Sequence, residues 1–271
     1  MMYREIPIQT DGSAPDTRLV TYILDTPGEH IKIRKRPAVI LCPGGGYELT
    51  SFREGEPLAM HFLNKGYHVG ILRYSTCPAR YPTALLELGT AMKLFHEHAE
   101  EWNVDTERLI VQGSSAGGHL AGCLGAFWNR KFLSDTLEVP SSVLRPSGLI
   151  LCYPVVTADE VFAHTGSFQN LLGDKYLNEK EDLSLEMQVG SHTPPCFIWH
   201  TFEDHTVPVE NALLLAMALR KSKVSTELHI FQKGVHGLGP ATKLVEKPDG
   251  SGVQKECECW IDLADTWLDN L

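Results

Sequence analysis

The sequence predicts an α/β fold in which a mostly parallel sheet of about eight strands carries helices on both faces. Short apolar runs alternate along the chain with longer segments whose apolar residues recur at helical spacing, which is typical of parallel strands joined by crossover helices. The 271 residues are 43% hydrophobic and 21% charged, a balance that supplies a substantial core. Because no internal repeat or low-complexity segment divides the chain, we expect a single domain over residues 1–271.

Seven apolar runs predict the strands of this sheet. In chain order they cover residues 18–24, 38–42, 68–74, 108–112, 148–153, 196–201 and 226–231. Five further segments predict helices, because their apolar residues recur at helical spacing. These helices cover residues 56–65, 82–102, 117–127, 209–222 and 258–268. Pro82 at a helix start and Gly66 just past a helix end fit the residues that commonly begin and end helices.

The region 155–195 interrupts the alternation of strands and helices. It is polar, charged around 175–186 and broken by Gly166, Gly173 and Gly190. Structureless loops of this length are rare in compact domains, so we expect an insertion with short helices. It follows a predicted strand and should lie near the carboxyl ends of the strands, where open α/β sheets bind ligands. A lid or a wall of the substrate pocket is the functional interpretation, and a surface excursion is the alternative.

Composition excludes several classes of partner. The formal net charge is −10 and no Lys/Arg cluster is longer than the one at 32–36, so a nucleic acid is not expected. No apolar stretch approaches the roughly 18 residues of a membrane span, and residues 1–12 show no secretion signal. We therefore expect a cytoplasmic protein that does not enter a membrane.

The seven cysteines predict free thiols and no metal site. Their number is odd, and Cys42, Cys152 and Cys196 lie in predicted strands, where a thiol serves as a small apolar side chain. Cys257 and Cys259 are too close together for ordinary zinc-ligand spacing and have no second pair nearby.

The most informative motif is Gly113-Ser114-Ser115-Ala116-Gly117, which lies between a predicted strand and a predicted helix. In a G-x-S-x-G turn the serine has a strained backbone at a sharp bend, and the glycines avoid collisions with neighbouring elements. Ser115 is therefore the candidate nucleophile. If Ser114 had this role, Gln112 would stand at a position that needs a small residue.

A serine nucleophile needs a base and a group that orients the base. His236 is the candidate base because it follows a predicted strand within the glycine-rich segment 234–239, which can bring an imidazole close to a catalytic turn. His200 and His205 are the alternatives, although both are nearly adjacent to the candidate acid.

Asp204 is the candidate acid, since it lies in the polar turn 201–208 that leaves one predicted strand and enters a helix. Glu203 is the alternative acid, and a helix N-cap is the alternative role for Asp204. The order Ser115, Asp204, His236 is the order found in α/β-hydrolases.

A glycine-rich segment completes the candidate site. The predicted strand ending at Cys42 leads into residues 43–47, Pro-Gly-Gly-Gly-Tyr, whose N–H groups can point at a developing negative charge. The N–H group of Ala116 would provide a further donor from a second loop. A phosphate-binding loop is the rival interpretation, but neither G-x-G-x-x-G nor a following G-K-[ST] is present.

With these motifs in this order, the chain resembles α/β-hydrolases of the esterase and lipase group. It is especially similar to small bacterial acetyl-esterase and xylan-esterase-like proteins, some of them known as sugar hydrolases. The resemblance extends over about residues 18–268, and it includes the segments 198–201 and 207–211 and the Gly-Leu-Gly run after the histidine.

The resemblance implies roles for single residues. Ser115 would be the nucleophile, His236 the general base and then acid, and Asp204 the group that holds the imidazole tautomer. Gly45, Gly46 and Ala116 would form the oxyanion hole. Pro43 departs from the family pattern, because the lipase-type motif has histidine there; the choice of Gly45 over Gly44 depends on how this loop is anchored.

We therefore expect a serine esterase that removes a short acyl group, most simply acetyl, from a small hydroxylated molecule such as a sugar, without a cofactor or metal. A serine amidase or peptidase on the same residues and a non-catalytic binding protein are the alternatives. By position, Tyr47, Phe52, Arg53 and residues 168–176 are candidates for the pocket wall. The oligomeric state, including a homo-oligomer, is left open by the sequence.

Overall fold

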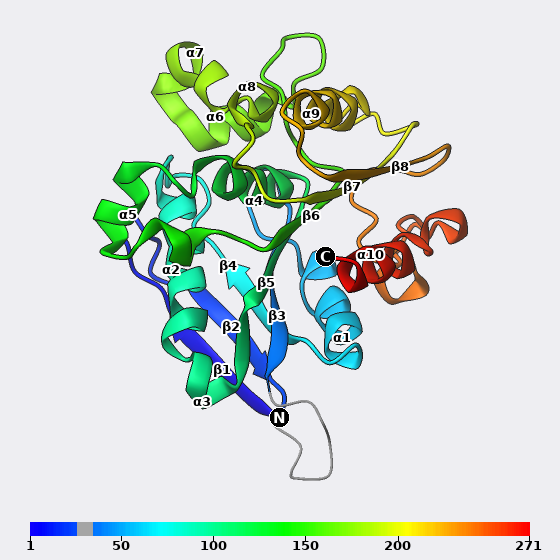
Figure 1. Ribbon diagram of the computed structural model, residues 1–271. Coiled ribbons are helices and arrows are strands. Elements are labelled where there is room, and N and C mark those ends of the chain that lie inside the picture. Colours follow the sequence, from blue (N-terminus) through cyan, green and yellow to red (C-terminus); the bar gives the residue numbers. More distant parts are fainter. Residues whose placement is uncertain (26–34) are drawn as a thin grey trace.

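The chain folds around one eight-stranded sheet in the computed structural model, which describes residues 1–25 and 35–271 (Figure 1). The strands are β1 (Met2–Pro7), β2 (Arg18–Ile23), β3 (Arg36–Cys42), β4 (His68–Arg73), β5 (Val104–Ser114), β6 (Gly148–Cys152), β7 (Cys196–Thr201) and β8 (Thr226–Phe231). Their order in the sheet is β1-β2-β4-β3-β5-β6-β7-β8. The strands β3 to β8 pair in parallel, and β1 and β2 are antiparallel.

All seven predicted strands are present, and one strand was missed. The missed strand β1 lies at an edge of the sheet and, among the described residues, pairs with β2 alone, with Met2 opposite Ile23. Most of its side chains are exposed. A strand of this kind needs no apolar run, so the sequence carries no pattern that would predict it.

Ten helices connect and cover the strands among the described residues. They are α1 (Glu56–Asn64), α2 (Thr83–Glu97), α3 (Ala99–Trp102), α4 (Ala116–Phe127), α5 (Lys131–Leu137), α6 (Thr165–Leu172), α7 (Tyr176–Glu179), α8 (Leu185–Gln188), α9 (Glu210–Lys221) and α10 (Trp260–Asp269). The helix predicted over 82–102 is divided into α2 and α3, because the backbone of His98 leaves the helical range at φ −94° and ψ 9°.

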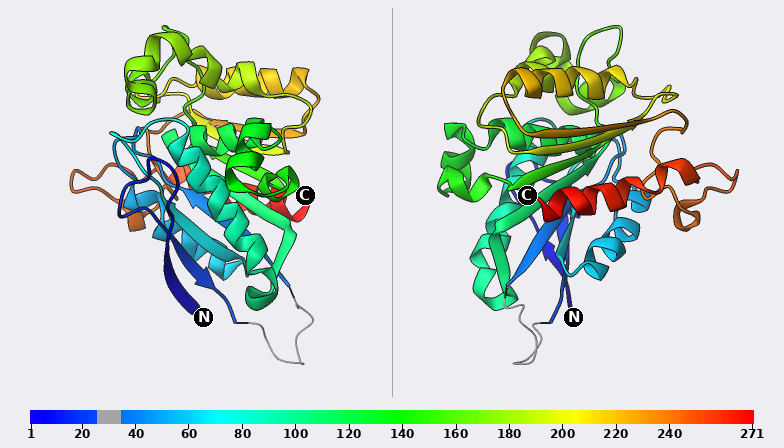
Figure 2. Two further views of the ribbon diagram at one scale, coloured as in Figure 1. Left: turned by 90° about the vertical axis from the view of Figure 1, so that its left-hand side faces the viewer. Right: turned by 45° about the vertical axis from the view of Figure 1, so that its right-hand side comes forward.

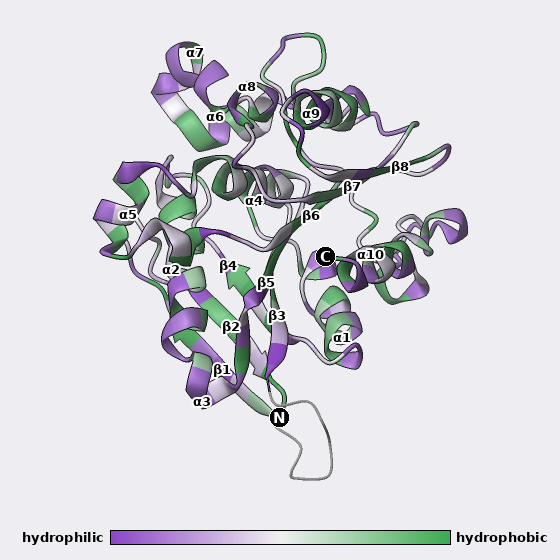
Figure 3. Cartoon of the chain, in the orientation of Figure 1, coloured by the Kyte–Doolittle hydropathy of each residue, from purple (hydrophilic) through white to green (hydrophobic). Residues whose placement is uncertain are grey.

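The helices form layers on both faces of the sheet, as predicted. Helices α2, α4 and α9 pack on one face, where Leu88, Leu124 and Leu215 belong to one apolar cluster. Helices α1 and α10 pack on the other face through Phe62 and Trp260 (Figures 1 and 2). Figure 3 shows hydrophobic residues along β6 and β7 between these layers and mixed colours along the covering helices. The central strands β4, β6 and β7 are therefore shielded from water on both faces.

The carboxyl ends of the parallel strands lie level along one edge of the sheet. Cys42 of β3 pairs with Gly113 of β5, and Ser114 pairs with Cys152 of β6. Thr201 of β7 pairs with Phe231 of β8. The loops that follow β3, β5, β7 and β8 hold the predicted site residues, so this register brings all four loops to the same edge.

The insertion predicted over 155–195 carries α6, α7 and α8, and α8 lies beside α9 (Figure 1). Leu183 and Leu185 anchor it in the core, so this segment is packed against the sheet layers rather than extended from them.

The remaining predictions concern the cysteines, the basic cluster at 32–36 and the absence of a membrane span. Cys42, Cys152 and Cys196 are buried free thiols, as expected. Two members of the basic cluster at 32–36, Lys32 and Arg34, lie outside the described residues. No helix in the described ranges is long and apolar enough to cross a membrane. The cytoplasmic location stays a prediction.

Candidate active site

Ser115 lies at the sharp turn between β5 and α4, with φ 56° and ψ −120°. The flanking glycines are required by space: a Cβ on Gly113 would lie 2.1 Å from the carbonyl oxygen of Gly117, and a Cβ on Gly117 would lie 2.0 Å from that of Cys42. The neighbouring Ser114 is buried and its Oγ accepts a hydrogen bond from Gln112 Nε2 at 3.0 Å. Of the two serines, Ser115 is therefore the one that the turn presents to the site.

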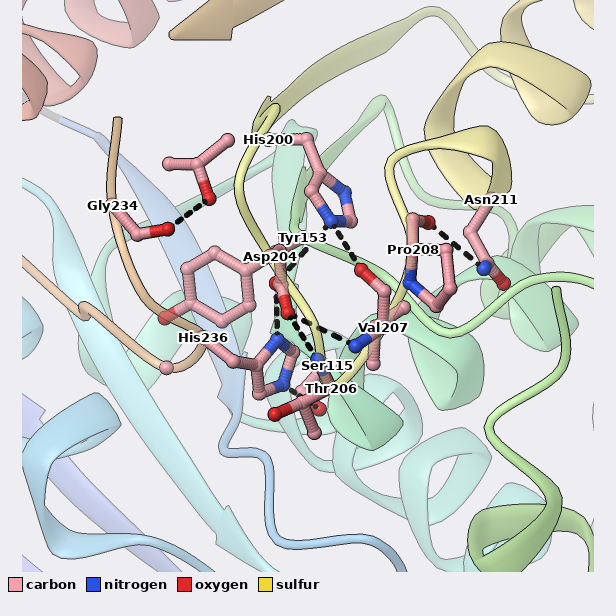
Figure 4. Close-up of polar contacts among 12 residues, drawn as sticks. Ser115, Tyr153, His200, Asp204, Thr206, Val207, Pro208, Asn211, Gly234 and His236 are labelled. Carbon is pink, nitrogen blue, oxygen red and sulfur yellow. Dashed lines mark hydrogen bonds and ion pairs between the residues drawn. The ribbon is translucent and has the colours of Figure 1, made fainter. Parts of the chain in front are cut away.

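The structure brings Ser115, His236 and Asp204 into one row of hydrogen bonds (Figure 4). His236 Nε2 lies 2.7 Å from Ser115 Oγ, and His236 Nδ1 lies 2.6 Å from Asp204 Oδ2. A carboxylate can only accept at Nδ1, so the neutral ring carries its proton there and presents a free Nε2 lone pair to the serine hydroxyl. This is the tautomer in which an imidazole can take the serine proton.

Asp204 is fixed by its own turn. Its Oδ1 accepts the backbone N–H groups of Thr206 at 2.9 Å and Val207 at 3.0 Å, and His200 Nε2 lies 3.3 Å from Oδ2. Burial alone would raise the pKa of this carboxyl, but the hydrogen bonds from His200 and His236 outweigh burial and hold the pKa well below its usual range. Asp204 therefore stays ionised beside the imidazole at neutral pH.

The alternative acid and bases lie away from the nucleophile. Glu203 and His205 are exposed. His200 is fully buried behind Asp204 and its Nε2 donates to the carbonyl oxygen of Val207 at 2.9 Å. His200 thus supports the acid turn and has no path to the serine hydroxyl.

The glycine-rich loop passes directly against the nucleophile. A Cβ on Gly44 would lie 2.9 Å from Ser115 Cβ. The N–H group of Gly44 is already occupied, because it donates to Glu54 Oε2 at 2.8 Å. The N–H groups of Gly45, Gly46 and Ala116 donate to no other described residue. Those three groups are therefore free to meet an oxyanion, and their role stays a prediction.

The sequence model of one family, BD-FAE, matches residues 26–219 of this chain. The chain belongs to the BD-FAE family. It is 37% identical over 209 residues to endo-1,4-beta-xylanase B of Butyrivibrio fibrisolvens and 30% identical over 213 residues to an acetylxylan esterase of Xylanibacter ruminicola. These matches cover 75% and 76% of the chain but only 33% and 42% of the two relatives. The chain thus spans less than half the length of these curated relatives.

Solved structures give the same fold over whole chains. The carboxylesterase Cest-2923 from Lactobacillus plantarum WCFS1 superposes with a TM-score of 0.86 at 26% identity, covering 100% of this chain and 98% of that one. The acetyl ester-xyloside bifunctional hydrolase from Caldicellulosiruptor lactoaceticus gives 0.80 at 36% identity, covering 98% and 92%. The predicted α/β-hydrolase fold and the resemblance to esterases are confirmed.

In this BD-FAE member the row of hydrogen bonds opens into a cavity of about 430 Å³. Besides the loop glycines, Ser115 and His236, its polar wall includes Glu48, Ser51, Arg53, His164, Thr206 and Lys247. Many hydrogen-bonding side chains and few apolar ones make this cavity suited to a hydroxylated ligand.

The predictions for the pocket wall were partly wrong. Arg53 lines the cavity as expected, but Tyr47 is buried and its hydroxyl bonds His119 Nδ1 at 2.8 Å. Phe52 is 75% exposed, with the Arg73 guanidinium 4.7 Å from its ring, because the short turn around it directs the ring outward. Phe168, from the predicted stretch 168–176, belongs to the core, and the insertion lines the cavity with His164 instead.

Sequence reasoning missed Glu54 and Tyr153 altogether. Glu54 is 2% exposed and its Oε1 accepts the hydroxyl of Tyr153 at 2.7 Å. In the sequence, Glu54 is one of three glutamates between residues 48 and 56, and no pattern marks it as the buried one. Only the packing of η1 (Phe52–Glu54), which brings Glu54 to the wall of the cavity, distinguishes it.

Proposed function

We propose that the protein is a serine carboxylesterase that hydrolyses short acyl esters, most simply acetyl esters, of a small hydroxylated substrate such as a sugar. The observation that carries this proposal is the continuous contact from Asp204 through His236 to Ser115 at the floor of an open polar cavity. A serine hydroxyl becomes a competent nucleophile when an oriented base lies within hydrogen-bond reach.

The proposed reaction has two halves. As Ser115 Oγ attacks the acyl carbon, its proton moves to His236 Nε2, and the carbonyl electrons collect on the oxygen facing the N–H groups of Gly45, Gly46 and Ala116. Collapse of this intermediate breaks the bond to the alcohol, which leaves with the proton from His236. Water then attacks the acyl-enzyme by the same route and releases the acid.

Asp204 contributes by stabilising the imidazolium that forms in each half. Its carboxylate lies 2.6 Å from Nδ1 and is held by two backbone N–H groups, so it need not reorganise when the charge appears. The entropy of orienting Asp204, His236 and Ser115 is lost when the protein folds, so it does not add to the barrier of the reaction.

The substrate class rests on the cavity and on the relatives. The cavity wall offers hydrogen-bond donors and acceptors of the kind that hydroxyl groups need, from Glu48, His164, Thr206 and Lys247. Two similar proteins are named as an acetylxylan esterase and an acetyl ester-xyloside hydrolase, which supports an acetylated sugar as the substrate.

The test is hydrolysis of p-nitrophenyl esters from acetate to octanoate by wild type, Ser115→Ala and the neighbouring control Ser114→Ala. We expect rates that fall with chain length, a loss of several orders of magnitude in kcat for Ser115→Ala, and a much smaller change for Ser114→Ala. Unchanged turnover in Ser115→Ala would overturn the proposal. Turnover of aminoacyl anilides but not of any ester would replace it with an amidase.

A further inference from the structure

Glu54 joins two of the loops that form the candidate active site. Its Oε2 accepts the backbone N–H of Gly44 at 2.8 Å, and its Oε1 accepts the hydroxyl of Tyr153 at 2.7 Å. Both oxygens act as acceptors, so an ionised carboxylate satisfies both partners at once. Such a group, 2% exposed and fully hydrogen-bonded, fixes the positions of the groups that it binds.

The contact continues to the loop that carries His236. Tyr153 uses its hydroxyl oxygen to accept the N–H of Gly239 at 2.8 Å, and its ring lies 5.1 Å from the His236 imidazole in an edge-on arrangement. Trp260 Nε1 donates to the carbonyl oxygen of the same Gly239 at 3.0 Å. A continuous row of hydrogen bonds therefore links Gly44, Glu54, Tyr153 and Gly239, and so joins the glycine-rich loop to the histidine loop.

Arg53 binds the same loop at the residue that directly follows His236. Its Nη2 donates to the carbonyl oxygen of Gly237 at 2.6 Å. Two consecutive residues of η1 thus hold the chain that follows His236, Arg53 directly at Gly237 and Glu54 through Tyr153 at Gly239. The short 3-10 turn is the common support of both loops.

We propose that Glu54 is a positioning residue that sets the glycine-rich loop relative to His236, and so places the oxyanion donors over Ser115. This inference rests on the proposed esterase function. It accounts for Pro43, which stands where the lipase-type motif has a histidine, because the carboxylate of Glu54 supplies the anchor of the loop. By occupying the N–H of Gly44, it also leaves Gly45 and Gly46 as the donors that face the substrate.

The test compares Glu54→Ala, Glu54→Gln, Tyr153→Phe and the double variant Glu54→Ala/Tyr153→Phe. Glu87→Gln is the matched control, because Glu87 is equally buried and holds the N–H of Ser75 at 2.7 Å outside the candidate site. For each protein we would measure kcat and KM on p-nitrophenyl acetate, the inhibition constant of a trifluoromethyl ketone, and Tm.

We expect Glu54→Ala to lower kcat by about 10²-fold with little change in KM, since displacing catalytic groups by about 1 Å costs that much. Affinity for the ketone, which mimics the tetrahedral intermediate, should fall in parallel. Glu54→Gln keeps one acceptor and should recover part of the loss. The double variant should lose less than the product of the single losses, because both changes interrupt the same contact.

The inference is overturned if Glu54→Ala keeps the wild-type kcat. It is also overturned if the only defects of Glu54→Ala are a higher KM or a lower Tm like that of Glu87→Gln. If Glu54→Ala does not fold, the same criteria apply to Glu54→Gln, which keeps the size of the side chain. A wild type without esterase activity would overturn the proposed function and this inference together, whereas an active wild type with insensitive variants overturns the inference alone.

Discussion

Replacement of Asp204 by asparagine tests the electrostatic part of the proposed mechanism. The carboxylate is fully buried, lies 2.6 Å from His236 Nδ1 and accepts two backbone N–H groups of its own turn. Asparagine has nearly the same shape and keeps one acceptor oxygen for those N–H groups. The substitution therefore removes the charge while disturbing the packing little.

The expected loss follows from the geometry. Two unit charges 2.6 Å apart attract by about 6 kcal/mol at an effective dielectric constant of about 20. This attraction develops only when His236 becomes an imidazolium, so its loss raises the barrier by up to that amount. At about 1.4 kcal/mol per tenfold, kcat should fall by about 10⁴-fold. An amide N–H facing Nδ1 would also favour the wrong tautomer of the ring.

The assay is turnover of p-nitrophenyl acetate under saturating conditions, with Tm measured to show that the variant is folded. Glu203→Gln is the matched control, because it removes the adjacent, exposed carboxylate and should keep kcat close to that of wild type. The reasoning is refuted if Asp204→Asn keeps kcat within tenfold of wild type, or if Glu203→Gln is equally damaging.

Two further predictions concern the glycine-rich loop and a buried histidine. Gly45→Ala should abolish most activity, since φ is +132° and the added Cβ would lie 2.1 Å from the carbonyl oxygen of Leu49. Gly46→Ala should cost only about 1–2 kcal/mol in the free energy of unfolding, because φ is +64° and no atom lies closer than 3.8 Å to the added Cβ. Measurements of kcat and of urea unfolding for both variants check this prediction, and equal losses in the two variants would contradict it. Burial lowers the pKa of His119 from 6.5 to about 4. The unfolded chain then binds this proton more readily than the folded one, so stability should decrease by about 3 kcal/mol as pH falls from 7 to 4, and His119→Gln should flatten that part of a pH series of urea unfolding curves. An unchanged slope in the variant would show that another group causes the loss.

The apolar runs of the sequence were enough to locate most of the sheet. A strand such as β6, buried on both faces, must be apolar throughout, so residues 148–152 identify it without any tertiary information. Strand β1 could not be found in this way, because one edge position and exposed side chains leave its residues free to be polar. The break between α2 and α3 was hidden for a similar reason, since the backbone of His98 changes direction within an uninterrupted helical pattern.

In the candidate site, too, the features set by local backbone geometry could be predicted from the sequence, and the contacts between distant residues could not. The spacing of Gly113, Ser115 and Gly117 is a local requirement of a sharp turn, so the sequence alone determined which serine the turn presents. It also supplied an acid and a histidine in the right order. The sequence named Asp204 as the acid and left Glu203 as the alternative. The structure separates the two, because adjacent residues in a turn point in different directions and the carboxylate of Asp204 is the one that reaches His236.

The support beneath the site was decided by tertiary structure alone. Gly44, Glu54, Tyr153 and Gly239 lie far apart in the chain and carry no shared pattern, yet their hydrogen bonds determine which glycine N–H groups remain free. Local backbone geometry restricts the residue types at a few neighbouring positions, so a local turn can be predicted from the sequence. A hydrogen bond between distant loops restricts only the final packing, so it becomes visible when the sheet has brought the loops together.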